Sequence, residues 1–352
     1  MIKNIWKYSK YVITLILVIG SGYLAFNKID LSKLMEVMKN VNYVYVILPI
    51  PVIVFSHWLR AYRWKTMLKP IYKDKDISVW NLFSAVMVGY ALNSVTPRGG
   101  EFLRPFVFSK REKVSYSTSF ATIIVERFID LISLLLLFAG VFYFFRDQII
   151  RALNTSFDSN SILVPTVMVI GVLLLSFYRP FVMFFLKLLI KPISEKLFLR
   201  ISSLFEKFLH GFEIIRRPSM YFRLTLESLS IWICYTIPMF IVFFAFNFQQ
   251  TAHLGFDDAI LLIVISGIGV TIAPTPGALG VYDLLIKNAM IEIYQINKEE
   301  AIAYALLTHG INYFVQVVVG GLFMIREGIT FIPKKEELII DSNDDLINNK
   351  TV

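Results

Sequence analysis

The 352-residue chain is 56% hydrophobic and carries a net charge of +9. Soluble domains contain about 45–50% apolar residues, so this composition indicates an integral membrane protein. The basic residues lie in short segments between apolar runs, which follows the positive-inside pattern and argues against a nucleic-acid partner. The single cysteine, Cys234, excludes a disulfide framework.

Apolar runs recur along the whole chain, and a spanning helix needs about 20 mostly apolar residues. The runs cover residues 11–26, 43–59, 79–92, 118–145, 162–177, 224–246, 259–273 and 301–325. Two of them, 79–92 and 259–273, are too short to span and end at proline- and glycine-containing sequence. The period-two alternation of a membrane β-barrel is absent. The sequence therefore predicts an all-α polytopic membrane protein with about six spanning helices.

The distribution of lysine and arginine predicts which loops lie on the cytoplasmic side of the membrane. The segments expected on the cytoplasmic side are the basic N-terminus and residues 60–75, 110–113, 179–217 and 326–335. Because 79–92 lies between two such segments, we expect 78–108 to form a re-entrant hairpin from the cytoplasm, with its tip at 96–100. The second short run, 259–273, is interpreted in the same way. We expect 259–293 to form a re-entrant hairpin that enters from outside, with its tip at 274–280. Both termini are then cytoplasmic. The first run looks like a signal peptide, but without a cleavage site we expect an uncleaved helix.

The order of parts is the same in two halves of the chain: spanning helix, re-entrant hairpin, spanning helix, in opposite orientation. Repeat 1 covers about 43–146 and repeat 2 about 224–326; in this alignment Arg127 falls on His309, and Asp130 on Asn312. Inverted repeats with interrupted segments indicate a transporter whose site lies at the repeat interface. We assign residues 1–332 to one membrane domain, and we expect 333–352 to be a disordered polar tail. Amphipathic interfacial helices are expected at 195–217 and near 34–41.

Three charged residues, Glu126, Arg127 and Asp130, lie in the middle of the run 118–145. A charge at the bilayer centre costs roughly 2.5–3.5 kcal/mol, so such charges persist only when they face one another, water or a polar ligand. Glu126 and Asp130 share a helix face, and Arg127 can pair with Asp130. Two interpretations stay open: a structural ion cluster, and a polar site for a lipid headgroup or a coupling ion.

The first hairpin carries a second group of chemically distinctive residues. They are Pro97, Arg98, Gly99, Gly100, Glu101 and Arg104. A proline-glycine turn with exposed backbone N–H groups, joined by arginine, suits an anion such as phosphate. The alternative is that Arg98 closes a salt bridge with Glu126 or Asp130.

Further candidates lie on the neighbouring helices. Arg60 lies on the same helix face as His57 and Trp64. Together with Arg63 it is interpreted as marking the cytoplasmic end of its helix. The alternative is that Arg60 lines a cavity. In the second hairpin the uncharged residues Pro274, Pro276, Gly277 and Gly280 would open the backbone. Asp283, His309 and Asn312 are candidates for ion coupling. His309 would titrate near neutral pH, unless its role is structural.

Motifs of enzymes are missing from the sequence. There is no His/Cys metal cluster, P-loop, dinucleotide fingerprint or nucleophile elbow. We therefore expect no metal, no cofactor and no catalytic activity.

Four motifs carry a resemblance to a known family: Leu-Arg-Ala-Tyr-Arg-Trp at 59–64, Thr-Pro-Arg-Gly-Gly-Glu at 96–101 with Arg104, Glu-Arg-Phe-Ile-Asp at 126–130, and Pro-Gly-Ala-Leu-Gly-Val at 276–281. Over roughly 5–330 the chain resembles the membrane domain of bacterial lysylphosphatidylglycerol synthases. In those synthases the domain is implicated in flipping the aminoacylated lipid, while a separate soluble domain makes it. The resemblance implies a stand-alone, flippase-like membrane domain in a bacterial cytoplasmic membrane, without aminoacyl transfer, and it leaves the lipid unidentified.

These inferences favour a transporter that moves an anionic phospholipid or a polyprenyl-linked lipid between leaflets, downhill or coupled to an ion. Arg98 and Arg104 would engage the phosphate, and Glu126, Arg127 and Asp130 would organise the site. One alternative is a membrane-embedded transferase acting on polyprenyl-phosphate sugars, with Glu101 as its acid or base. Another is an accessory subunit of a cell-envelope enzyme. The expected partners are the bilayer and its lipid, with a homo-oligomer or such an enzyme in addition.

Overall fold

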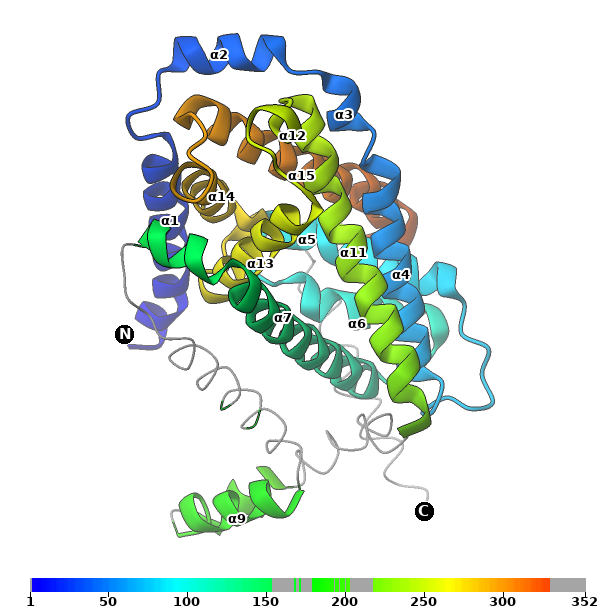
Figure 1. Ribbon diagram of the computed structural model, residues 1–352. Coiled ribbons are helices and arrows are strands. Elements are labelled where there is room, and N and C mark those ends of the chain that lie inside the picture. Colours follow the sequence, from blue (N-terminus) through cyan, green and yellow to red (C-terminus); the bar gives the residue numbers. More distant parts are fainter. Residues whose placement is uncertain are drawn as a thin grey trace.

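The computed structural model describes residues 2–153, 179–192 and 218–329, together with positions 168, 171, 194, 195, 197–199, 201 and 202 (Figure 1). Within this described part every regular element is a helix and none is a strand. The predicted all-α polytopic class is confirmed. Most of the expected run 162–177 and most of the expected amphipathic helix 195–217 lie outside the described residues.

Four helices of the described part are long and apolar enough to cross a membrane. They are α4 (Ile50–Leu68) with the short α3 (Tyr43–Ile47) before it, α7 (Tyr116–Leu153), α11 (Tyr221–Ala245) and α15 (Lys298–Glu327). A fifth span results if α1 (Ile2–Phe26) and α2 (Leu31–Asn40), which are bent by 81° at their junction, count as one. Asp30 caps α2 by accepting from the backbone N–H groups of Ser32 and Lys33. In Figure 1, α4 and α11 run side by side, and α2 lies across one end of the molecule.

Two pairs of shorter helices lie between the long ones. The first pair is α5 (Val79–Val95) and α6 (Gly100–Glu112); the second is α13 (Phe256–Ile272) and α14 (Val281–Glu292), joined through the 3-10 turn η3 (Pro276–Ala278). The 17 residues of α5 rise only about 26 Å, less than the ~30 Å core of a bilayer. Both breaks fall where the proline and glycine residues predicted them. Smaller elements are α9 (Arg179–Leu189), η2 (Pro218–Met220) and α12 (Phe248–Thr251).

Glycine allows the helices of the first pair to cross closely. A Cβ on Gly100 would overlap the carbonyl group of Gly89, so α6 can approach α5 only without a side chain at this position. In the second pair the turn requires left-handed backbone, with φ of +57° at Gly277 and +76° at Gly280. The short interrupted helices therefore depend on these residues for their shape.

The two hairpins touch each other. The turn η3 packs against α5, and Arg98 Nη2 donates to the carbonyl oxygen of Thr271 at 3.2 Å. Tyr313 of α15 donates to the carbonyl oxygen of Ser94 at 3.2 Å, beside Gly277. The order α4, α5–α6, α7 recurs as α11, α13–α14, α15. The inverted orientation of the halves and the domain limits stay predictions.

Candidate functional site

A buried cluster of charged side chains joins α4, α6 and α7. Its members are Arg60, Arg63, Arg104, Glu126, Arg127 and Asp130. Four guanidinium groups face two carboxylates, which leaves a formal charge of +2 (4 − 2). The side chains of Arg63 and Glu126 are 0% exposed, so these two charges rely on their ion pairs rather than on solvent, whereas Asp130 and Arg127 are 20% and 41% exposed.

Glu126 is the centre of this ion cluster. Its Oε1 accepts from Arg60 Nε, Arg104 Nη1 and Arg127 Nη2, each at 3.0 Å. Asp130, one turn later on α7, accepts from the Nη2 atoms of Arg60 and Arg63 at 2.5 Å. The four-residue spacing puts both carboxylates on one helix face, where the same arginine, Arg60, reaches both. The expected pairing of Arg127 with Asp130 is present at 3.3 Å.

Neutral side chains fix the orientation of the arginines. The Arg104 guanidinium lies 4.1 Å from the ring centroid of Trp64, which itself donates to Thr122 at 2.8 Å. On the other side, Arg60 Nη1 lies 2.8 Å from the Tyr235 hydroxyl and Arg63 Nη1 lies 2.9 Å from Ser228 Oγ. Tyr235 and Ser228 belong to α11, so this long helix is tied to the cluster as well.

The structure corrects the interpretation of Arg60 and Arg63 as markers of a helix end. Both are buried and paired, because α4 turns this stripe toward α7 rather than toward water. Sequence reasoning missed Arg63, Tyr235 and Ser228 as members of the site. The one available signal for Arg63 was its i+3 spacing from Arg60.

The first hairpin also differs in part from expectation. The N–H of Gly100 donates to Asn93 Oδ1 at 2.8 Å, and those of Glu101 and Phe102 point back into the turn, so these backbone donors already have partners. The backbone N–H groups of this short break are therefore used within the hairpin and are not free to bind an anion. Arg98, with φ of +55° in this break, is exposed and pairs with neither Glu126 nor Asp130.

A polar cavity of about 430 Å³ lies where the hairpins meet. Its lining includes Arg60, Tyr90, Asn93, Arg98, Glu101, Arg127, Asp130, Tyr235, Pro274, Gly277 and Gln316. Arg104 and Glu126 do not line it, because they are enclosed in the ion cluster behind its wall. The charged lining comprises three arginines and two carboxylates from α4, the first hairpin and α7, and the second hairpin adds uncharged residues.

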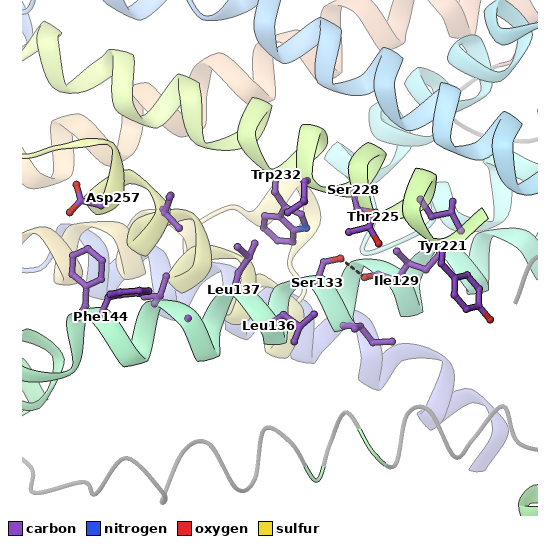
Figure 2. Close-up of a pocket in the computed structure, with 17 residues that line it drawn as sticks. Ile129, Ser133, Leu136, Leu137, Phe144, Tyr221, Thr225, Ser228, Trp232 and Asp257 are labelled. Atoms are coloured by element: carbon purple, nitrogen blue, oxygen red, sulfur yellow. Dashed lines mark hydrogen bonds between the residues drawn. The ribbon is translucent and has the colours of Figure 1, made fainter. Parts of the chain in front are cut away.

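An apolar groove of about 1,020 Å³ lies beside this polar cavity, between α7 and α11 (Figure 2). Its walls include Leu136, Leu137 and Phe144 from α7 and Leu229 and Trp232 from α11. Figure 2 shows Trp232 reaching from α11 toward α7. Trp232 also lines the polar cavity, so one side chain separates a charged space from an apolar one.

A smaller cavity of about 180 Å³ adjoins the polar cavity at the turn of the second hairpin. His309 and Asn312 line it, and the His309 ring pairs with Asp283 at 3.0 Å. Asn312 donates to the carbonyl oxygen of Thr308 on its own helix at 2.9 Å. Two of the three ion-coupling candidates are therefore joined, and the third lies beside them. The described residues contain no group of three or more His, Cys, Asp or Glu side chains that could hold a metal ion.

The other hairpin residues have distinct places. Pro97 and Gly99 lie in the break before α6, and Pro276 begins η3. A Cβ on Gly280 would meet Ser21 and the backbone of Gly22 in α1, so this glycine lets α1 pack against the start of α14. These positions shape the hairpins rather than line the polar cavity.

Comparison with known proteins adds a family relationship. The family model described as the lysylphosphatidylglycerol synthase TM region matches residues 11–320. A UPF0104 membrane protein of Pyrococcus horikoshii is 22% identical over 84% of this chain and 91% of its own length. Another, from Methanocaldococcus jannaschii, is 32% identical over 29% of this chain and 31% of its own length. Glycosyltransferase AglD of Haloferax volcanii is 22% identical over 92% of this chain, which spans about half, 55%, of that relative. No solved structure matches significantly.

Proposed function

Since the chain belongs to the family of the lysylphosphatidylglycerol synthase transmembrane region, we propose that it moves a lipid between membrane leaflets. The lipid class is an anionic phospholipid or a polyprenyl-linked lipid. The observation that carries this proposal is the polar cavity with the apolar groove beside it, which together match a molecule with a charged head and apolar chains. Fold alone would not carry it, because one fold can host many functions.

In this proposal the phosphate lies in the polar cavity. Arg98 is exposed there, and the Arg127 side chain is 41% exposed, so both can donate to an anion without leaving the ion cluster unpaired. Arg104 holds Glu126 in place behind the wall. Arg60, Glu126 and Asp130 thus organise the site, and Arg98 and Arg127 contact the headgroup. Glu101 at the same wall would select against further negative charge or accept from a hydroxyl group.

The lipid chains would follow the apolar groove. In a bilayer these chains are already in an apolar medium, so the groove aligns them and adds little affinity. Affinity and selectivity then depend on the headgroup, because each hydrogen bond from a charged donor contributes about 1.5–3 kcal/mol. The chemistry of the headgroup, rather than the length of the chains, should therefore decide which lipid is moved.

The test is leaflet exchange of fluorescent lipids in proteoliposomes. Phosphatidylglycerol and a polyprenyl phosphate are compared with zwitterionic phosphatidylcholine. We expect wild type to accelerate an anionic lipid and Arg98→Gln to slow it about 10-fold or more, the equivalent of ~1.5 kcal/mol. The matched control is Lys110→Gln, which removes one positive charge from the same hairpin at an exposed position outside the polar cavity. Equal rates for all three proteins, or no exchange by folded protein, would refute the proposal.

A second candidate is a membrane-embedded transferase acting on polyprenyl-phosphate sugars. It is favoured by the similarity to a protein named a glycosyltransferase, which extends over 92% of this chain. Glu101, half-buried in the cavity wall, would serve as its acid or base. Product formation from a polyprenyl-phosphate sugar in vitro, abolished by Glu101→Gln, would favour this candidate over transport.

The cellular setting is part of the proposal. The chain is a multi-pass membrane protein, and its named relatives are archaeal. We propose a cytoplasmic membrane with both termini inside, on the charge pattern of the loops. The proposed partners are a second copy of the chain or a cell-envelope enzyme, and the enzyme would bring the lipid from its site of synthesis.

A further inference from the structure

The His309 ring has an acceptor at each of its two nitrogens. Nδ1 lies 3.0 and 3.1 Å from the carboxylate oxygens of Asp283, and Nε2 lies 2.7 Å from the carbonyl oxygen of Gly277. A neutral imidazole has one N–H and can donate to only one of these groups. Both contacts are hydrogen bonds only when the His309–Asp283 pair holds one extra proton, as imidazolium beside carboxylate or as imidazole beside carboxylic acid.

The contact with Gly277 controls the position of a turn. Gly277 belongs to η3, adopts φ of +57°, and lies against the Tyr313 ring and the Ser94 carbonyl. Together with Ala278 it lines both the polar cavity and the small cavity. When the extra proton leaves, a nitrogen lone pair faces the Gly277 carbonyl or the carboxylate, and one of the two contacts becomes repulsive. The carboxylate is the stronger acceptor, so the remaining proton stays on Nδ1 and the contact of Nε2 with the Gly277 carbonyl becomes the repulsive one. The turn that separates the two cavities thereby loses its hydrogen bond to His309 of α15.

We propose that a proton bound between His309 and Asp283 latches the turn of the second hairpin across the polar cavity, and that its release opens this wall. The inference rests on the proposed function, and it names the ion that would be coupled to lipid movement. By linkage, a lipid that prefers the open wall lowers the proton affinity of the pair, and the proton lowers the affinity for that lipid by the same factor.

Protons can reach the pair through the small cavity. Its volume of about 180 Å³ and polar lining are sufficient for water, and it shares Tyr235, Gly277, Ala278 and Gln316 with the polar cavity. No member of the ion cluster lines the small cavity itself.

Phenols and a thiol are further titratable side chains near the ring. They are Tyr282 on α14, with its ring 4.9 Å away, Tyr313 on α15, at 6.2 Å, and Tyr235 and Cys234 on α11, which line the small cavity. Ser56 of α4 and Ile263 of α13 also line that cavity and do not titrate, and α5 faces the ring region with Ser94. Among the described groups that contact the ring, Asp283 is the charged one. Phenols and thiols in water lose their protons above the range of imidazole, so a change between pH 5 and 8 reports the pair.

The first test follows the turn without any transport. Ala278→Cys is made in a Cys234→Ala background, because Cys234 lines the same cavity. Its labelling rate with a water-soluble methanethiosulfonate is divided by that of Thr251→Cys, an exposed site, which cancels the pH dependence of thiol ionisation. We expect this ratio to rise at least five-fold from pH 5 to 8.5. His309→Lys, which keeps a charge, should hold it low, and His309→Gln should hold it high. A flat wild-type ratio overturns the latch.

A second measurement guards against variants that misfold. Nitrogen NMR of histidine-labelled wild type, with the His309→Gln spectrum subtracted, reports the protons on this ring directly. We expect both ring nitrogens, or one nitrogen together with the Asp283 carboxyl, to carry a proton at pH 5 and one proton to leave by pH 8.5. A ring and carboxyl with unchanged protonation across this range overturn the inference.

Lipid exchange then separates the latch from the transport proposal. Exchange by wild type with the same pH profile as His309→Gln would reject the latch and leave transport standing. If the labelling ratio and the NMR signals change with pH but no anionic lipid is exchanged, transport is rejected and the proton-controlled turn remains.

Discussion

Replacing Glu126 by glutamine tests whether the ion cluster stabilises the fold. Gln keeps the shape of the side chain and removes its charge, so the formal charge of the cluster rises from +2 to +3. Breaking a buried ion pair by removing one partner costs about 3–5 kcal/mol. Glu126 contacts Arg60, Arg104 and Arg127 and lies 3.7 Å from Arg63, so we expect a loss near the upper end of that range.

The loss is a large fraction of the total free energy of unfolding of a domain, which is about 5–15 kcal/mol. At about 2–4 °C per kcal/mol, thermal unfolding in detergent should shift downward by on the order of 10 °C. The matched control is Glu292→Gln, an exposed carboxylate at the end of α14, which should change the transition by less than about 0.5 kcal/mol.

A rescue experiment tests the electrostatic cause. Adding Arg104→Gln to Glu126→Gln restores the charge balance, so the double variant should lose less stability than the sum of the two single variants, by 1 kcal/mol or more. Additive losses, or a Glu126→Gln variant as stable as the Glu292→Gln control, would refute the reasoning. In that case the cluster would be solvated by water rather than held by its own pairs.

Two further substitutions probe the scaffold of the site. Gly100→Ala places a methyl group on the Gly89 carbonyl, so it should lower the free energy of unfolding by about 1–3 kcal/mol, measured by thermal unfolding. It should also slow lipid exchange by distorting the first hairpin. Unchanged stability and exchange would show that the crossing of α5 and α6 can relax. Lys287→Met removes an ammonium group that donates to the carbonyl oxygens of Leu24 and Ala25 near the end of α1, at 2.9 and 3.0 Å. A cysteine placed at buried Ala25, in a Cys234→Ala background, should therefore react faster with a thiol label in the Lys287→Met variant than with Lys287 present. Equal labelling rates would mean that α1 docks without this contact.

The helical elements followed from local chemistry. Proline lacks a backbone donor and glycine tolerates left-handed backbone, so the breaks at 96–99 and 273–280 were readable from residue types. The start of α2 also depends on local chemistry, because the Asp30 side chain accepts from the backbone N–H group of Ser32, although the expected helix was placed near 34–41. The spacing of Glu126 and Asp130 put both carboxylates on one face, because helix periodicity is a property of the segment itself.

The partners of those charges depended on how helices cross. Arg63 looked like the end of a helix, yet the rotation of α4 against α7 places it on Asp130. Arg98 and Arg104 lie six residues apart in one hairpin, and the packing alone sends Arg98 into the polar cavity and Arg104 behind its wall. Trp232 carried no sequence signal at all, since its role comes from standing between two cavities.

The amino-acid sequence by itself determined the membrane class, the approximate positions of the helices, the two breaks and the helix face that carries Glu126 and Asp130, because these depend on interactions within a few residues. Tertiary structure alone decided which arginine meets which carboxylate, where the polar cavity opens and that His309 reaches both Asp283 and Gly277. The arginine–carboxylate pairs of the cluster join residues up to 70 positions apart, as Arg60 and Asp130 do, and their geometry exists only after the helices have packed.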